Sequence, residues 1–363
     1  MASPGYASGS RATYGIPGGP VGAGFVRVTL GTGLSDRSGN AMAAAFVRRF
    51  EVRGREGFVR EGGNNDTARG ATPLGVAFEA RFDGSFTAAG NVGAAHNPYD
   101  VHGIDLDGDG LKDMVVANAV TSSVMVYRGN GDGTFGAPRT YATGNYPYTM
   151  LVTDLTGDGN PDIATVNFYG NSVTIWRGVG DGTLDGVETL SSSGNPSGIA
   201  SGDIDGDGKP ELVVSRWNGG GVDIFRRNDD GTLELATTVA TGNNPGQVAM
   251  ARIDGDAFLD LVVSLYGSPS GVAIYRGDGA GGFVAPVVLG TPSGAHTMGV
   301  HDLDGDGSLD IVVANEQSAS LSVFKGNGDG SFGARVDLAS GNNPYVRVAD
   351  MDGDDRPELV VGN

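Results

Sequence analysis

Residues 105–113 hold the densest cluster of possible metal ligands in the sequence, D-L-D-G-D-G-L-K-D. Carboxylates stand at loop positions 1, 3, 5 and 9, and glycines at positions 4 and 6 let the backbone turn sharply. Such a turn brings the carboxylates and the position-7 carbonyl toward one point. Several hard oxygen ligands favour calcium over a transition metal. The pattern predicts a calcium loop whose ligands are Asp105, Asp107, Asp109, Leu111 (through its carbonyl oxygen) and Asp113.

An EF-hand loop opens in the same way, but it needs a bidentate glutamate at position 12 and a helix on each side. Position 12 here is Val116, within the run M-V-V-A at 114–117. A short apolar run that follows turn signals favours a β-strand. The sequence therefore excludes an EF-hand and places the loop directly before a strand.

The acidic loop recurs five more times along the chain. Matching loops begin at Asp154, Asp203, Arg252, Asp302 and Asp350, and successive starts lie 48 to 50 residues apart. A single acidic loop would be a weak signal. A near-constant period of this length indicates a repeat architecture.

Each period contains four short segments that favour strands. In the second period these are residues 148–154, 162–167, 172–178 and 184–190. Four-stranded antiparallel units of this size are typical of β-propeller blades. We therefore expect an all-β propeller with a calcium loop between the first and second strands of each blade.

The incomplete units at the two ends of the repeat region would combine into one blade, which predicts a propeller of six blades. The sixth period ends after its second strand at 358–362, and residues 74–81 and 83–86 are predicted to supply its third and fourth strands. This pairing would close the ring and remove exposed sheet edges. A seventh blade would need an acidic loop near Glu56, where the sequence has none.

Composition limits the partners. The 363-residue chain has a formal net charge of -19, which excludes nucleic acid and an anionic membrane surface as natural partners. It has no cysteine and hence no disulfide, and no stretch is apolar enough to span a bilayer. The first residues lack the basic and apolar regions of a signal peptide, so we expect export to depend on sequence outside this chain.

The acidic loops and the turns around them resemble those of FG-GAP / VCBS-repeat β-propellers, the family that includes the head of integrin α subunits. Two kinds of turn add to the resemblance: those between the third and fourth strands, such as G-D-G-T-F at 131–135, and those before the first strands, such as G-N-Y-P at 144–147. The resemblance covers residues 71–363. It implies structural calcium loops on one face, and ligands on the opposite face or at the central opening.

The resemblance also implies calcium ligands in the later loops. Thr156 replaces an aspartate but keeps an oxygen, whereas Arg252 would occupy the space and charge of the ion, so we expect about five calcium ions and a weak or empty fourth loop. The implied ligands are Asp154, Thr156, Asp158, Asn160, Asp162, Asp203, Asp205, Asp207, Lys209, Glu211, Asp254, Asp256, Asp260, Asp302, Asp304, Asp306, Ser308, Asp310, Asp350, Asp352, Asp354, Arg356 and Glu358.

Residues 1–67 contain no calcium loop. Segments 24–30 and 45–52 favour strands and flank a turn cluster at 35–40. This piece resembles the end of a bacterial Ig-like surface domain, and the alternative is a partly disordered leader. We expect two parts, residues 1–67 and a propeller at 71–363.

The face opposite to the calcium loops holds the candidate ligand-binding residues. Aromatic rings beside polar side chains suit a polar ligand with apolar faces, such as a sugar. The alternative is that loop aromatics of this kind pack locally. The candidates are Tyr99, Tyr148, Phe168, Tyr169, Arg216, Trp217, Tyr266 and Tyr345.

Three functions remain open from the sequence. We favour a calcium-stabilised, secreted or cell-surface module that binds carbohydrate or a protein partner without catalysis. The family resemblance keeps open a lyase-like, polysaccharide-degrading enzyme that uses tyrosine and the histidines at 96, 102, 296 and 301 near the central opening. The third alternative is a structural spacer in a large adhesin.

Overall fold

The computed structural model describes residues 97–350, except 229 and 243, and residues 357–362, together with four strands near the N-terminus. The chain divides into two compact units, Met1–Ser85 and Phe86–Asn363. In the first unit, β1 (Gly5–Ala7) pairs with β2 (Arg11–Thr13), and β3 (Gly24–Leu30) pairs with β4 (Phe46–Val52), both antiparallel. The strands predicted at 24–30 and 45–52 are therefore confirmed, the second one residue shorter.

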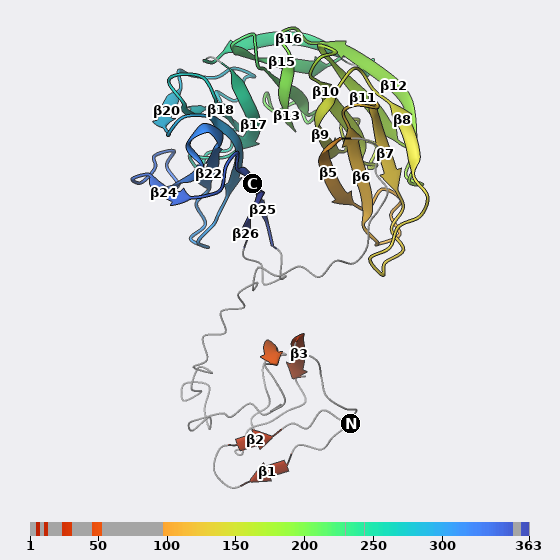
Figure 1. Cartoon of the computed structure of the whole chain (residues 1–363), viewed down its shortest axis with the longest axis vertical. Helices are drawn as coiled ribbons and strands as arrows, with labels where there is room; N and C mark the ends of the chain where they lie inside the picture. The colour runs from red at the N-terminus through yellow and green to blue at the C-terminus, as the bar shows by residue number, and fades with distance from the viewer. Residues whose placement is uncertain are drawn as a thin grey trace. The chain divides into compact units, whose positions relative to one another are not determined.

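The second unit is made of antiparallel sheets whose strands follow one another in the chain (Figure 1). Five sheets of the described residues are four-stranded and one is two-stranded. The first two are β5 (Pro98–Ile104), β6 (Asp113–Asn118), β7 (Ser123–Tyr127), β8 (Arg139–Ala142), and β9 (Pro147–Thr153), β10 (Asp162–Asn167), β11 (Ser172–Gly178), β12 (Leu184–Ser191). The third and fourth are β13 (Pro196–Gly202), β14 (Glu211–Arg216), β15 (Gly221–Arg227), β16 (Leu233–Ala240), and β17 (Pro245–Ala251), β18 (Asp260–Leu265), β19 (Gly271–Tyr275), β20 (Val287–Gly290). The fifth is β21 (Ala295–His301), β22 (Asp310–Asn315), β23 (Ser320–Phe324), β24 (Val336–Ala339), and the sixth is β25 (Tyr345–Ala349) with β26 (Glu358–Gly362).

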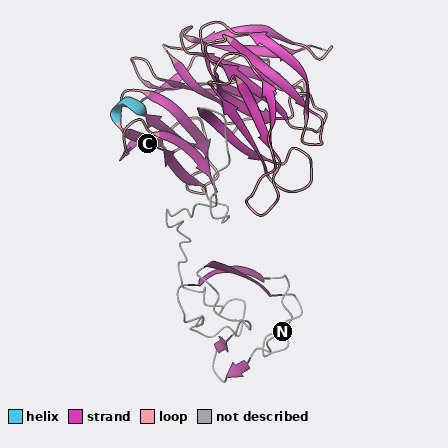
Figure 2. Cartoon of the chain, turned by 45° about the vertical axis from the view of Figure 1, so that its right-hand side comes forward, coloured by secondary structure: helices cyan, strands magenta, loops and turns pink. Residues whose placement is uncertain are grey.

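The second sheet shows how closely the repeat pattern predicted the strands. The segments 162–167 and 172–178 are β10 and β11 without change; β9 is shifted by one residue from its predicted range, and β12 is one residue longer. The all-β propeller architecture is thus confirmed, and apart from the short 3₁₀ turn Glu316–Ser318 the described residues form strands and loops (Figure 2). The predicted strands at 74–81 and 83–86 lie outside the described residues, as do Asp352, Asp354 and Arg356.

Burial explains why the second strands are the most apolar. Each lies inside its sheet and is covered by neighbouring sheets on both faces, so every residue of β10, β18 and β22 is buried. Residues of neighbouring sheets form shared clusters; one joins Val166 and Ile175 of the second sheet to Leu212 and Val214 of the third. Burying one such side chain contributes roughly 1.5–3 kcal/mol. The outermost strands, in contrast, are largely exposed, as in β24.

The first strand of each sheet lies innermost. β5 contacts β9, β9 contacts β13, β13 contacts β17, β17 contacts β21, and β21 contacts β25, so these strands surround one central region in chain order (Figure 1). In the five complete sheets the pairing of first and second strand shifts register near the start of the first strand. Such bulges redirect side chains and are common beside functional sites. No helix among the described residues is long and apolar enough to cross a membrane.

Candidate functional site

The five described acidic loops connect the first and second strands of their sheets. In the first loop, the carboxylate of Asp105 accepts hydrogen bonds from Gly108 N (2.7 Å) and Gly110 N (2.9 Å). Both glycines have positive φ, 71° and 84°, which residues with a side chain rarely adopt. The second, third and fifth loops repeat the two bonds. The carboxylate at position 1 therefore shapes the loop backbone.

The carboxylate at position 9 has a structural role that sequence reasoning missed. Asp113 is 1% exposed; its Oδ2 accepts a hydrogen bond from Leu106 N (3.0 Å) and its Oδ1 from Gly129 N (2.9 Å). The aspartates at position 9 of the second, fourth and fifth loops make the same pair of contacts. Position 9 thus ties the start of the loop to the end of the third strand.

Glu211 holds position 9 in the third loop and differs from those aspartates. Its Oε2 accepts a hydrogen bond from Ile204 N (2.8 Å), but its fully buried Oε1 has no hydrogen-bond partner among the described residues. The cation closest to that oxygen is Arg226, with Nε at 3.7 Å. A buried carboxylate oxygen without a donor is costly unless a cation lies beside it.

Carboxylate oxygens also cluster within 4.8 Å of one another in three loops. The clusters are Asp105, Asp107 and Asp113; Asp203, Asp205 and Glu211; and Asp302, Asp304 and Asp306. Together with the unpartnered Glu211 oxygen, these donor sets fit a divalent cation that prefers oxygen ligands. The second and fourth loops form no such group of three among the described residues.

The fourth loop differs from the others in backbone as well as in charge. Arg252 bends back over it, so that Nε donates a hydrogen bond to Ala257 O at 3.1 Å. Ala257 stands at position 6, where the other described loops have glycine, and it does not adopt a positive φ. Its three aspartates, Asp254, Asp256 and Asp260, therefore lie in a loop of different shape.

The aromatic residues predicted for the opposite face lie together. Tyr99 and Tyr148 occupy the bulges at the starts of β5 and β9, and their ring centroids are 5.2 Å apart. The ring of Tyr148 is 5.6 Å from Phe168, which is 5.1 Å from Tyr169. Tyr148, Phe168 and Tyr169 belong to the second sheet, and Tyr99 joins them because the first sheet stands beside it.

A second aromatic group comes from later sheets. Trp217 and Tyr266 have ring centroids 4.9 Å apart, and His296 is 5.6 Å from Trp217 and 5.8 Å from Tyr345. His296 also joins the two groups, because its Nε2 lies 3.1 Å from the hydroxyl of Tyr148. We call the combined set the aromatic face: Tyr99, Tyr146, Tyr148, Phe168, Tyr169, Trp217, Tyr266, His296 and Tyr345.

Two members of the aromatic face were not predicted as ligand residues. Tyr146 has a φ of 65° in its turn, lies 4.7 Å from Tyr169, and donates a hydrogen bond to the hydroxyl of Tyr99 (2.9 Å). His296 was considered only for catalysis. An alignment of the repeats could have added His296 to the ligand-binding candidates, because His296 and Tyr148 are each the second residue of the first strand of their sheet.

Arg216 is the predicted ligand residue that lies apart. Its Nε is 3.4 Å from Asp223 Oδ1 in the neighbouring strand, and its Nη1 donates a hydrogen bond to Ser193 Oγ (3.1 Å). Its guanidinium is therefore held by Asp223 and Ser193.

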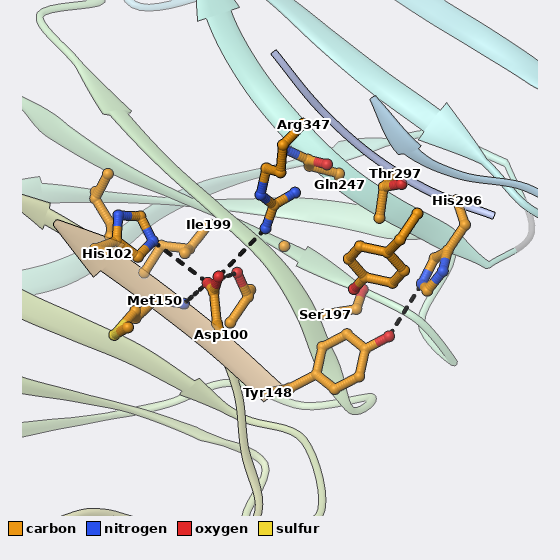
Figure 3. Close-up of a pocket in the computed structure, with 14 residues that line it drawn as sticks. Asp100, His102, Tyr148, Met150, Ser197, Ile199, Gln247, His296, Thr297 and Arg347 are labelled. Carbon is orange, nitrogen blue, oxygen red and sulfur yellow. Dashed lines mark hydrogen bonds and ion pairs between the residues drawn. The ribbon is translucent and has the colours of Figure 1, made fainter. Parts of the chain in front are cut away.

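A pocket of about 190 Å³ opens at the centre, next to the aromatic face. Every innermost strand from β5 to β25 contributes to its wall (Figure 3). Ionisable side chains are concentrated at one side of it: Asp100 and His102 of β5 and Arg347 of β25. The remaining wall holds the His296 imidazole, two tyrosines and uncharged side chains.

Asp100 holds three sheets together at this pocket. Its carboxylate accepts hydrogen bonds from Thr149 Oγ1 (2.8 Å) and Met150 N (3.0 Å) of β9, and it pairs with Arg347 Nη2 (3.3 Å) of β25 (Figure 3). Burial by itself would raise the pKa of Asp100, but hydrogen bonding and charge from His102, together with Arg347 and Met150 N–H, lower that pKa to about 2. The carboxylate therefore stays ionised at the centre of the fold.

The three histidines in the described part of the chain do not all lie at the pocket. His102 and His296 line the pocket, whereas His301 ends β21 outside the pocket wall and His96 lies outside the described residues. Burial lowers the pKa of His296, although the Glu316 carboxylate opposes this. Burial also raises the pKa of Tyr148. The lowered pKa makes the His296 imidazole a weaker proton acceptor, and the raised pKa of Tyr148 disfavours the phenolate that would act as a base.

Structural comparison finds similar folds at low sequence identity. A lectin of Agrocybe aegerita, titled for its recognition of non-reducing terminal N-acetylglucosamine, is 20% identical, with a TM-score of 0.49 over 88% of this chain and 81% of that chain. BBS1N, solved in complex with ARL6DN, is 15% identical, with a TM-score of 0.52 over 74% and 77%. A putative 6-phosphogluconolactonase of Bacteroides fragilis is 17% identical, with a TM-score of 0.50 over 69% and 70%.

Sequence comparison identifies the repeat itself. No curated protein sequence matches the chain. The model of the FG-GAP-like repeat, however, matches five overlapping segments, 105–165, 154–214, 203–263, 253–313 and 302–361. Each match begins at or beside an acidic loop and includes the following one, and together they span well over half of the chain. The protein therefore belongs to the FG-GAP-like repeat family and has its β-propeller fold.

Proposed function

We propose that the aromatic face binds carbohydrate without chemical change to it. The observation that supports this is the continuous series of ring contacts, from Tyr169 to Tyr345, beside a small pocket lined by both polar and apolar groups. The rings are partly accessible: Tyr99 is 43% and Tyr169 59% exposed. Aromatic rings cover the apolar faces of sugars, and their polar edges and neighbours bond sugar hydroxyls.

The pocket sets the scale of the ligand. Its volume of about 190 Å³ equals that of roughly six water molecules in liquid water, which suits one sugar ring. The exposed rings outside it extend the contact to neighbouring sugars. Gln317 adds a polar edge, because its Nε2 donates a hydrogen bond to the hydroxyl of Tyr266 (3.0 Å). A chain of sugars therefore suits this face better than an isolated monosaccharide.

Affinity electrophoresis against a panel of neutral and acidic polysaccharides, with calcium present, tests this proposal. We expect retardation by at least one polymer, and its loss in Trp217→Ala. The matched control is Trp176→Ala, because Trp176 belongs to a separate ring pair with Tyr141 (5.4 Å) and donates a hydrogen bond to Ala142 O. Retardation that both variants lose equally, or that neither loses, would contradict binding at the aromatic face.

The recovered polymer distinguishes binding from catalysis. The contact between Tyr148 and His296 is the feature that favours a lyase-like enzyme, but the raised pKa of Tyr148 opposes its use as a base. Intact polymer would support a binding module, and shortened polymer would favour the enzyme. A protein partner or a spacer role would be indicated if no polymer were retarded or cleaved.

We also propose that the acidic loops bind calcium as structural clips. The clustered carboxylates and the unpartnered Glu211 oxygen support this. In the first loop, the predicted ligands Asp105, Asp107, Asp109, Asp113 and the Leu111 carbonyl would hold the ion. The bound ion would neutralise the carboxylates and hold the loop closed. Because an ion that binds only the folded state stabilises it, chelation should lower the melting temperature. Loops of this kind suit calcium-rich surroundings, so we propose secretion or a cell-surface location.

The sixth sheet is part of the same proposal. We propose that residues 74–81 and 83–86 complete it as its third and fourth strands, and that the propeller at 71–363 has six blades, separate from residues 1–67. The pairing of Arg347 in β25 with Asp100 in β5 supports this, because it brings the first and the last described sheets together. Removing residues 1–67 should leave the melting temperature unchanged, whereas removing residues 1–90 should lower it.

A further inference from the structure

A basic residue stands at the end of the third strand in each complete sheet. We call these residues the third-strand cations. They occupy corresponding positions in the repeats, one residue before or one residue after the last residue of β7, β11, β15, β19 and β23. They are Arg128, Arg177, Arg226, Arg276 and Lys325.

In four sheets the third-strand cation pairs with the aspartate at position 3 of its own acidic loop. The shared geometry is a cation that enters the loop from the side of the third strand. The pairs are Arg128 Nη2 with Asp107 Oδ2 (2.7 Å), Arg226 Nη2 with Asp205 Oδ2 (3.0 Å), Arg276 Nε with Asp254 Oδ2 (3.6 Å), and Lys325 Nζ with Asp304 Oδ2.

The second sheet supplies the exception that makes the pattern informative. Its loop has Thr156 at position 3, and there Arg177 forms no ion pair with any described residue. The cation is present but the aspartate is missing, and the pair is missing with it. Position 3 therefore determines whether the cation enters the loop.

The position-3 carboxylates need a positive charge. The side chain of Asp107 is 4% exposed, and Arg128 is the cation paired with its Oδ2 and with Oδ2 of Asp109 (3.1 Å). Like charges confined in one loop repel each other, and a neighbouring cation offsets this repulsion. The guanidinium thus supplies part of the charge that a calcium ion would supply.

The third-strand cations also contact the next sheet. Arg276 Nη2 donates a hydrogen bond to Asp329 O (3.1 Å) in the third-to-fourth-strand turn of the fifth sheet. A Cβ added at Gly281, in the corresponding turn of the fourth sheet, would lie 2.5 Å from Arg226 Nη2. The cation is therefore held between its own loop and the neighbouring turn.

We propose that the four paired third-strand cations, Arg128, Arg226, Arg276 and Lys325, are internal counter-ions that stabilise the acidic loops without metal and compete with calcium for the carboxylate at position 3. This inference rests on the proposed calcium binding. A loop with its counter-ion keeps its shape when calcium is low, and calcium must displace or share the cation to bind. The counter-ion therefore weakens calcium binding while it protects the fold.

Replacing a counter-ion by a neutral side chain of similar length tests the proposal. We expect Arg128→Gln and Arg226→Gln to lower the melting temperature in chelator and to leave it nearly unchanged in saturating calcium. Calcium affinity at the altered loop should rise by about threefold to tenfold, because the net negative charge of the site increases. Calorimetric titration measures the affinity, and thermal unfolding with and without chelator measures the stability.

Arg177→Gln is the matched control, since its cation has no ion pair to lose. We expect both its melting temperatures and its calcium affinities to match those of the unaltered protein. An equal loss of stability in chelator and in calcium would show a packing role and overturn the proposal. So would weaker calcium binding, because the cation would then support the ligands.

The same measurements separate this inference from the calcium proposal. If the unaltered chain binds no calcium, the calcium proposal fails, and the claim of competition fails with it. The counter-ion claim is then judged by the melt in chelator alone, where an unchanged melting temperature in Arg128→Gln and Arg226→Gln would overturn it.

Discussion

The two faces of this propeller are built by different rules. On the loop face, each sheet forms a complete group of its own, because the acidic residues, the glycines and the anchoring carboxylate lie within one stretch of nine residues. On the aromatic face, the second sheet contributes Tyr146, Tyr148, Phe168 and Tyr169, every other described sheet contributes one ring, and contacts between sheets join these rings into one series. The same backbone contacts recur in most of the acidic loops, whereas the rings of the aromatic face differ from sheet to sheet. This difference is the basis for proposing that the acidic loops maintain the fold and that the aromatic face binds a ligand.

The largest expected effect is on the loop face. Asp113→Ala removes a buried carboxylate and leaves the amide groups of Leu106 and Gly129 without their acceptor. Each unpaired buried donor costs about 1–3 kcal/mol, so for two donors we expect a loss of about 2–6 kcal/mol in the free energy of unfolding, measured by urea denaturation. Tyr169→Ala, on the aromatic face, should change it by less than about 0.5 kcal/mol. An equal loss of unfolding free energy in Asp113→Ala and Tyr169→Ala would contradict the proposed difference between the two faces.

The second-largest expected effect concerns Asp100, which joins β5 to β9 and β25 at the pocket beside the aromatic face. Its pKa is lowered from 3.8 to about 2, so its ionised form contributes about 2 kcal/mol of stability above pH 4. Because the pKa is lower in the folded state, this contribution is lost as the pH falls from about 4 toward 2. Asp100→Asn should flatten the acid limb of the stability profile in that window. A variant with an unchanged acid limb would show that the carboxylate does not hold the sheets together.

A cross-test of the faces should show an effect of about tenfold. Trp217→Ala should weaken carbohydrate binding by about tenfold, the equivalent of 1.4 kcal/mol, and leave calcium stoichiometry unchanged. Asp205→Asn should do the reverse, lowering calcium binding at the third loop without changing carbohydrate affinity. Isothermal titration with the polysaccharide and with calcium measures the carbohydrate affinity and the calcium stoichiometry of each variant. If Asp205→Asn weakened carbohydrate binding as much as Trp217→Ala does, the faces would not be independent.

The smallest effect tests the fourth loop. Arg252→Asp alone should add little calcium binding, since Ala257 keeps the backbone away from the positive φ that glycine adopts in the other described loops. The double variant Arg252→Asp with Ala257→Gly should add one calcium ion per chain. Native mass spectrometry counts the ions. An added ion in the single variant would show that charge alone had closed the loop.

Local sequence predicted the strands well where a turn and a strand follow each other within a few residues. The run from Asp162 to Asn167 became β10 without change, because the glycine turn before it and the buried Val and Ile positions within it specify the same strand. The role of position 9 was half predicted. Its residue type indicated a ligand, but its hydrogen bond to the end of the third strand spans 16 residues in Asp113 and was not visible in the local pattern.

The aromatic face was predicted as a set of residues but not as a set of contacts. Tyr99 and Tyr148 are 49 residues apart, and only the stacking of their sheets brings the rings within 5.2 Å. His296 reaches Tyr148 across the centre of the propeller. Arg216 seemed equivalent to its neighbours in sequence, yet Asp223 in the adjacent strand holds its guanidinium.

The sequence by itself determined the repeat, the order of the strands and the composition of the acidic loops. Each of these depends on interactions within one period, where glycine conformation, strand alternation and carboxylate spacing act over a few residues. The tertiary structure alone decided which aromatic rings meet, that Asp100 joins β5 to β9 and β25, and that the third-strand cations enter the acidic loops. Those contacts depend on how the sheets twist and stack around one centre, and that geometry is a property of the assembled sheets.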